Sequence, residues 1–326
     1  IEVLEGGEMK GLRIPLHALY PNLIQISSAS NIEGTLVCIS GVELGSLDGK
    51  DLKDKIVILD FDSNDLWIDT LNFGAKAVIF IEKECNKYNA LSKVLLTPFY
   101  APRAFLEKKY AETILKLAGM NAKVKLVVNV TWKEVEAENI IGVLEGEKKD
   151  EVIILSAHFD SFSVVPAISP GADEASSIAA LLSIARHYAS LRKVPRTIWF
   201  VAFSGHWQGL AGAREFVEQY FFCDKVQKGE LKIKALVNLD LSTENYQLSA
   251  MYIGHFYKYG STGGGAEITS RYNWVKSILT NIKTNLIQKF GFTSEDLNDV
   301  LSNYYWSSGT TEPYVLDSEP AALAGV

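Results

Sequence analysis

The stretch EVIILSAHFDS, residues 151–161, decides the fold of this chain. It opens with an unbroken apolar run and ends in polar residues. A short apolar run of this kind, rich in β-branched residues, is typical of a strand buried within a sheet. His158 and Asp160 follow the run, so we expect both side chains at the carboxyl end of that strand.

The segments around this stretch alternate between predicted strands and predicted amphipathic helices. Strand–helix–strand repetition predicts a sheet with helices on both faces. The predicted strands are ENIIGVLEG (138–146), RTIWFVAFSGHW (196–207) and IKALVNLDLS (233–242). The predicted helices are DEASSIAALLSIARHYASLR (173–192) and GLAGAREFVEQYF (209–221). A further strand, KVKLVVNVTW (123–132), is expected at the beginning of this larger α/β domain.

Earlier in the chain the elements are shorter. Buried strands are predicted in LKDKIVILDF (52–61) and AKAVIFIE (75–82), and a helix between them ends at Gly74. A second helix is predicted in Arg103–Gly119. We therefore expect a small α/β domain at 15–120, and a larger α/β domain at 121–326 together with 1–14. The small domain has no cluster of His, Cys, Asp or Glu with ligand spacing, so no chemistry is placed there.

Charged and imidazole side chains gather at the ends of the larger domain's strands. They are His158, Asp160, Asp173, His206 and Asp240. Ligands of open α/β sheets bind beyond the carboxyl ends of the strands, and imidazole with carboxylate suits Zn²⁺. Asp160 lies two residues after His158, on the same side of a strand, and can orient its ring. The alternative is that these are solvated loop residues, with Asp173 serving as a helix cap.

Composition excludes several other classes of function. The net charge of the 326 residues is −7, so no basic surface for nucleic acid is expected. No apolar stretch approaches the roughly 20 residues of a membrane span. Three scattered cysteines, Cys38, Cys85 and Cys223, do not form a disulfide framework. The chain starts at Ile1 without a signal-peptide pattern, which favours a processed form or an excised piece.

The ordered motifs resemble the co-catalytic dizinc aminopeptidases and glutamate carboxypeptidases. The resemblance covers Val124–Val326 and includes VIILSAHFDS, PGADEASSIAALL, FSGHWQGLAGAREF and LDSEPAALAGV. It implies a zinc-peptidase-like mixed sheet with helices on both faces. The earlier segments resemble the protease-associated domain often attached in this family. The resemblance also favours an extracytoplasmic or secreted location.

Carried over residue by residue, the family pattern is incomplete here. The resemblance implies metal ligation by His158, Asp173 and Asp240, with Asp160 orienting His158. The family's adjacent Glu pair, a general base and a second-metal ligand, is replaced by His206 and Trp207. Imidazole can act as a base, whereas indole offers no lone pair to a metal. The family's last His ligand would lie beyond Val326. We therefore expect at most one zinc ion, with a metal-free site as the close alternative.

These replacements favour a degenerate zinc-peptidase-like domain that is non-catalytic or weakly active. Its expected role is to bind a peptide or protein, in one version as part of a larger membrane-anchored protein. The transferrin-receptor branch of the superfamily illustrates such a change, since it keeps the fold and loses the zinc chemistry. The alternative is an active aminopeptidase or carboxypeptidase that hydrolyses peptides with one metal and His206 as base. A third version recruits a second-metal ligand from beyond Val326, which Trp207 disfavours.

Overall fold

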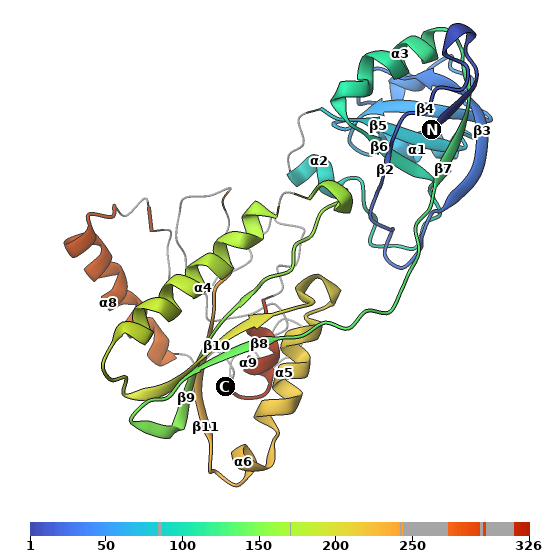
Figure 1. Ribbon diagram of the computed structural model, residues 1–326. Coiled ribbons are helices and arrows are strands. Elements are labelled where there is room, and N and C mark those ends of the chain that lie inside the picture. The colour runs from blue at the N-terminus through green and yellow to red at the C-terminus, as the bar shows by residue number, and fades with distance from the viewer. Residues whose placement is uncertain (84–86, 170, 242, 244–272, 294–295, 298–315) are drawn as a thin grey trace, which may run out of the picture. The chain divides into compact units, whose positions relative to one another are not determined.

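The computed structural model describes residues 1–326 except 84–86, 170, 242, 244–272, 294–295 and 298–315. For residues 29, 87–88, 172–174, 273 and 276 it describes the backbone alone. The chain divides into two compact units, each with its own sheet (Figure 1). The first unit contains Ile1–Val135 and Phe162–Pro170, and the second contains Glu136–Ser161 and Gly171–Val326.

The first unit is built on a seven-stranded mixed sheet of order β1-β7-β3-β4-β5-β6-β2. Strands β3 to β6 are parallel neighbours, and the other pairs are antiparallel. The strands are β1 (Glu2–Glu5), β2 (His17–Ala18), β3 (Ala29–Cys38), β4 (Lys55–Asp60), β5 (Ala77–Ile81), β6 (Arg103–Leu106) and β7 (Lys123–Val128). The helices are α1 (Leu66–Asn72), α2 (Lys87–Leu91) and α3 (Ala111–Gly119).

The central strands of this sheet are apolar throughout because both faces are covered. All five residues of β5 are buried. Ile114 and Leu117 of α3 pack in the core on one face, and Leu66 and Trp67 of α1 pack in the core on the other. Because successive strand residues point to opposite faces, the uninterrupted apolar runs supply both cores.

The boundaries of this unit differ from the predicted 15–120. Residues 1–14 and 121–135 belong to it as well, because β1 pairs with β7 and β7 with β3. The prediction that KVKLVVNVTW belongs to the larger domain is therefore wrong. The predicted helix over Arg103–Gly119 is correct only from Ala111, since Arg103–Leu106 is a buried strand beside β5. Local apolar spacing does not identify a strand's partner, and only pairing assigns these segments.

The second unit is built on a four-stranded mixed sheet of order β11-β9-β10-β8. Strands β11, β9 and β10 are parallel, and β8 pairs antiparallel with β10. The strands are β8 (Ile140–Leu144), β9 (Lys148–His158), β10 (Arg196–Phe203) and β11 (Lys232–Asn238). The helices are α4 (Ala172–Ser190), α5 (Ala211–Phe221), α6 (Asp224–Gln227), α8 (Asn273–Phe290) and α9 (Glu319–Leu323).

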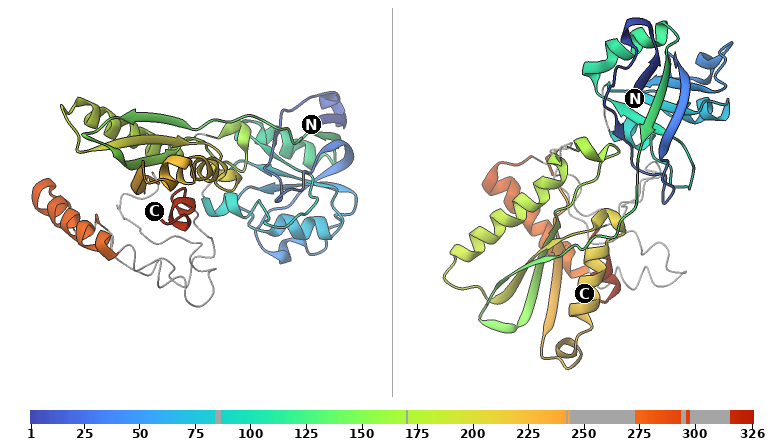
Figure 2. Two further views of the ribbon diagram at one scale, coloured as in Figure 1. Left: turned by 90° about the horizontal axis from the view of Figure 1, so that it is seen from below. Right: turned by 45° about the vertical axis from the view of Figure 1, so that its right-hand side comes forward.

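Helices lie on both faces of this second sheet, with α4 on one face and α5 and α9 on the other (Figure 2). Val152 and Ile154 of β9 and Val201 and Phe203 of β10 form a core with α5 and Ala321 of α9. The predicted α/β fold with helices on both faces of a mixed sheet is confirmed. Because β9, β10 and β11 are parallel, their carboxyl ends meet at one edge of the sheet.

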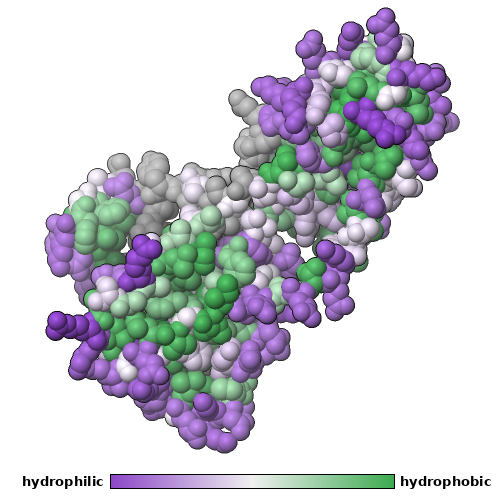
Figure 3. All heavy atoms as spheres, in the orientation of Figure 1, coloured by the Kyte–Doolittle hydropathy of each residue, from purple (hydrophilic) through white to green (hydrophobic). Residues whose placement is uncertain are grey.

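Part of the second unit's surface is apolar. Hydrophobic side chains gather on the face seen in Figure 3. The exposed ones include Ile140 (63%) and Val143 (58%) of β8 and Leu182 (64%) of α4. Within the described residues, none of the helices is both long and apolar enough to cross a membrane.

Candidate metal site

Three side chains from the three parallel strands converge at the carboxyl edge of the second sheet. His158 is the last residue of β9, His206 lies in the turn after β10, and Asp240 lies two residues after β11. One ligand atom from each residue lies within 4.8 Å of the others. The structure thus brings together two of the three predicted metal ligands, and adds His206, which the sequence predicted as a base.

His158 is buried, with 3% of its side chain exposed. Its Nδ1 lies 3.0 Å from the backbone carbonyl oxygen of Asp160 and 3.6 Å from the Asp160 carboxylate. Burial by itself would lower the pKa of His158, but the contacts with Asp160 and the charges of Asp317 and Asp240 outweigh it and raise the pKa to about 8. With Nδ1 held by Asp160, Nε2 is the atom left to meet a ligand.

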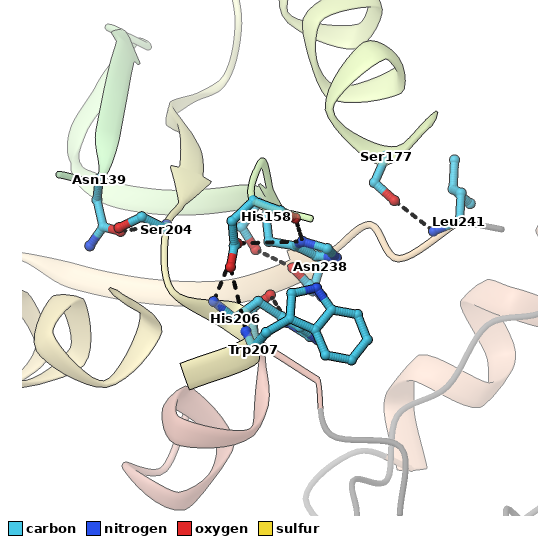
Figure 4. Close-up of polar contacts among 11 residues, drawn as sticks. Asn139, His158, Ser177, Ser204, His206, Trp207, Asn238 and Leu241 are labelled. Carbon is cyan, nitrogen blue, oxygen red and sulfur yellow. Dashed lines mark hydrogen bonds and ion pairs between the residues drawn. The ribbon is translucent and has the colours of Figure 1, made fainter. Parts of the chain in front are cut away.

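Asp160 was expected to orient the His158 ring, and the closer contact comes from its backbone oxygen. Its carboxylate instead accepts the backbone N–H groups of His206, at 3.3 Å, and Trp207, at 3.5 Å (Figure 4). Burial would raise the pKa of Asp160, but the bonds from His158 and these two N–H groups lower it below its usual range. Asp160 therefore ties the end of β9 to the turn after β10.

That turn owes its shape to glycines. Gly205 has φ +67°, in the left-handed region that glycine adopts without strain. A Cβ on Gly212 would lie 2.2 Å from the Ser204 backbone oxygen and 2.5 Å from Asn139 Oδ1, so only glycine fits there. Asn139 fixes both sides of the turn. Its Oδ1 accepts the Ser204 N–H at 3.1 Å, and its Nδ2 donates to the Gly212 carbonyl at 2.9 Å.

His206 is held between His158 and a buried carboxylate. Its ring stacks on that of His158, with centroids 4.1 Å apart and planes inclined by 18°. Its Nδ1 lies 2.9 Å from Oδ2 of Asp317, a residue just before α9. The side chain of Asp317 is 0% exposed. Sequence reasoning did not single out Asp317, although it lies in the quoted motif LDSEPAALAGV, where an acidic residue before a short helix was the available signal.

Asp240 is positioned by the loop that contains it. The Leu239 N–H donates to the Ser156 carbonyl of β9 at 2.7 Å. On the other side of Asp240, the Leu241 N–H donates to Ser177 Oγ at 2.7 Å, and the Leu241 carbonyl accepts from Ser176 Oγ at 2.8 Å. Both serines lie in the first turns of α4, so α4 and β9 together fix the Asp240 backbone.

Asp173 and Trp207 complete the predicted set. Asp173 is the second residue of α4, and its side chain lies outside the described residues, so its role as a ligand stays a prediction. Trp207 is 41% exposed, and its ring stands edge-on to His206 at 4.9 Å and to His158 at 6.5 Å between centroids. Indole at this position supplies an apolar wall beside the two imidazoles, where a carboxylate would supply a ligand.

Comparison with known proteins finds a family model that matches this part of the chain. Residues 139–297 match peptidase family M28. The matched residues cover most of the second unit, which we call the M28 unit below. The resemblance to co-catalytic zinc peptidases that the motifs indicated is thereby confirmed.

Relatives of the M28 unit include proteins named as probable zinc metalloproteases. One from Pyrenophora tritici-repentis is 32% identical over 135 residues, which cover 40% of this chain and 28% of that protein. Another, from Phaeosphaeria nodorum, is 28% identical over 147 residues, which cover 40% of this chain and 27% of that protein. The chain thus matches under a third of the length of either relative.

Solved structures are similar to this chain. The γ-secretase component nicastrin aligns with a TM-score of 0.55 at 14% identity, over 94% of this chain and 64% of that one. A zinc aminopeptidase from Bacillus subtilis aligns with a TM-score of 0.49 at 22% identity, over 88% of this chain and 63% of that one.

The donor set fits a zinc ion. Two imidazole nitrogens and a carboxylate oxygen are among the ligands zinc takes in proteins, and three protein ligands leave one position open. The three ligand atoms lie within 4.8 Å of one another, and the two stacked imidazole rings must turn for both of them to meet one ion in the ring plane. An oxygen acceptor lies at Nδ1 of each histidine, the Asp160 carbonyl for His158 and the Asp317 carboxylate for His206.

Proposed function

We propose that the M28 unit binds one zinc ion through His158, His206 and Asp240, hydrolyses peptides weakly or not at all, and acts as a peptide- or protein-binding domain. The observation that carries this is the position of His206. Its ligand atom lies within 4.8 Å of those of His158 and Asp240. The residue at the family's base position thus faces the ion as a ligand.

The loss of efficient hydrolysis follows from this assignment. Zinc supplies Lewis acidity and polarises a carbonyl, but hydrolysis also needs a base that takes a proton from the attacking water. Nδ1 of His206 faces Asp317, and under this proposal its Nε2 faces the ion. No lone pair of that ring remains for a proton. Trp207 cannot serve instead, because its indole nitrogen only donates.

A binding role has separate support. Ile140, Val143 and Leu182 are large apolar residues that lie exposed on the second unit, and exposed apolar surface often marks a contact with another protein. Nicastrin, which shares the fold, is named as a component of an assembly. We also propose that the first unit is a protease-associated domain, on the motifs in its sequence and its small α/β sheet.

One observation favours the alternative, a working hydrolase with a single metal. A histidine whose Nδ1 lies 2.9 Å from a buried aspartate is the arrangement of a general base, since the carboxylate orients the ring and stabilises its cation. In that version His158, Asp173 and Asp240 hold the ion and His206 stays free to accept a proton.

Zinc content and aminopeptidase activity, measured on the same variants, separate the two versions. We expect one zinc per chain and negligible turnover. In both His158→Ala and His206→Ala the loss of zinc affinity should exceed the roughly 10- to 100-fold cost of losing an outer-shell partner, since each removes a direct ligand. His17→Ala in the first unit is the matched control and should bind zinc normally. Measurable turnover that disappears in His206→Ala while zinc stays bound would establish the alternative.

A repair variant tests the missing second metal. His206→Glu combined with Trp207→Glu restores the family's carboxylate pair. We expect this variant to bind a second zinc ion more tightly than the unmodified chain, with activity still well below that of a complete site. Two zinc ions per chain in the unmodified protein would contradict the degenerate site.

A further inference from the structure

We infer that Asp317 is a positioning residue that fixes the ring orientation and tautomer of His206, and so makes a metal ligand of an imidazole that stands where the family has a glutamate. This inference rests on the proposed single-zinc site. Asp317 has no place in that site as a ligand, because neither of its oxygens belongs to the group around His158, His206 and Asp240.

The hydrogen bond determines which nitrogen of His206 is available. A carboxylate oxygen accepts, so the nitrogen facing it must carry a hydrogen. Nδ1 lies 2.9 Å from Asp317 Oδ2 and is therefore the N–H of the ring. In the neutral imidazole the lone pair then lies on Nε2, the atom left to face His158 and Asp240.

The burial of Asp317 shows that its carboxylate is directed inward. The side chain is 0% exposed, and a buried carboxylate is costly unless it is paired. Within the described part of the chain, Oδ1 has no hydrogen-bond partner, and Oδ2 pairs with His206. A residue that stabilised the fold alone would be expected to use both oxygens.

The neighbouring imidazole is held in the same way. His158 has its Nδ1 at 3.0 Å from the Asp160 carbonyl, and His206 has its Nδ1 at 2.9 Å from Asp317. The two rings are stacked within 18° of parallel. Each ring thus has an oxygen acceptor at Nδ1 and leaves Nε2 for the ion. The difference is that the acceptor for His158 lies two residues after the end of β9, whereas the acceptor for His206 comes from 111 residues further along the chain.

The decisive variant is Asp317→Asn, which keeps the shape and removes the carboxylate. We expect its zinc affinity, measured by competition with a chromophoric chelator, to fall by about 10- to 100-fold, the usual cost of losing such a partner. Glu107→Gln is the matched control. It removes the carboxylate that lies 3.2 Å from His17 in the first unit and should leave zinc affinity unchanged.

A second measurement needs no variant. Nitrogen-15 NMR of the metal-free wild-type protein reports the tautomer of each imidazole, and we expect the Nδ1–H form for His206. The inference is overturned if His206 shows the Nε2–H form, or if Asp317→Asn binds zinc as tightly as the wild type. If the wild type binds no zinc, the proposed function fails, whereas the tautomer of His206 still supports or refutes the role of Asp317.

Discussion

The two units bury polar groups in opposite ways. In the first unit the buried cations Lys93 and Arg103 meet backbone oxygens and aromatic rings. Lys93 Nζ donates to the Asn64 carbonyl at 2.6 Å, and Arg103 donates to the Tyr20 carbonyl at 2.9 Å and lies 4.8 Å from the Trp67 ring centre. Burial lowers the pKa of Arg103 to about 10.

In the second unit the buried ionisable groups include His158 and Asp317, and both face other ionisable side chains. His158 faces Asp160 and His206, and Asp317 faces His206. Buried groups that meet carbonyls and rings fasten loops to a core, whereas ionisable groups from three strand ends that meet at one point can hold an ion. The comparison separates polar burial that stabilises the fold from polar burial that serves a site.

The largest expected effect is on the stability of the first unit. Trp67 of α1 is 0% exposed, packs in the core, and donates from Nε1 to the Ser92 carbonyl at 2.9 Å. Trp67→Ala should lower the free energy of unfolding of the first unit by about 3–5 kcal/mol, the usual cost of such a cavity. Chemical denaturation measures it. Zinc affinity should stay unchanged, and a parallel loss of zinc would contradict the separation of the two roles.

A smaller effect is expected when the charge alone is removed. Lys93→Met keeps most of the side-chain volume between the rings of Phe61 and Phe80, 5.6 and 5.4 Å from the ammonium. It removes the 2.6 Å hydrogen bond to the Asn64 carbonyl, which keeps a longer contact of 3.5 Å from Ser92 Oγ. We expect a destabilisation of about 1–3 kcal/mol. Lys123→Met, on an exposed lysine that pairs with Glu33, is the control and should cost under about 1 kcal/mol. Equal losses of unfolding free energy in the two variants would show that the buried contact of Lys93 stabilises the fold no more than an exposed ion pair does.

The smallest effect concerns pH and the second unit. The pKa of His158 is raised from 6.5 to about 8. In the metal-free protein this contributes stability below pH 6.5, which is lost as pH rises through about 8. Zinc requires the neutral ring, so its affinity should increase about tenfold per pH unit in the range below the raised pKa and level off above it. Thermal unfolding and zinc titrations measure both trends.

As pH rises, the stability of the metal-free protein should fall while its zinc affinity should increase, so the two measurements test the same proton of His158 independently. His158→Gln should remove the pH dependence of stability in the metal-free protein. A zinc affinity that is flat between about pH 6.5 and 8 would mean that His158 carries no proton to displace.

The sequence predicted the parts of this protein that depend on local pattern. The run before His158 is the buried strand β9, and the segments around it are the predicted strands and helices of the M28 unit. Position 207 cannot supply a metal ligand, because the indole ring of tryptophan has no lone pair available for a metal. Such features follow from the periodicity of side chains along a strand or helix and from the chemistry of single residues.

Other features were decided by tertiary structure. Strand pairing assigned β1 and β7 to the first unit, since apolar alternation marks a strand without naming its neighbour. His206 was expected to be a base, and only the structure shows that one of its ring nitrogens lies within 4.8 Å of ligand atoms of His158 and Asp240, which is why we propose it as a ligand. Asp317 lies 111 residues from the ring it contacts. No local pattern encodes a hydrogen bond over that separation, because the two residues meet only once α9 packs against α5 beside the ends of the strands.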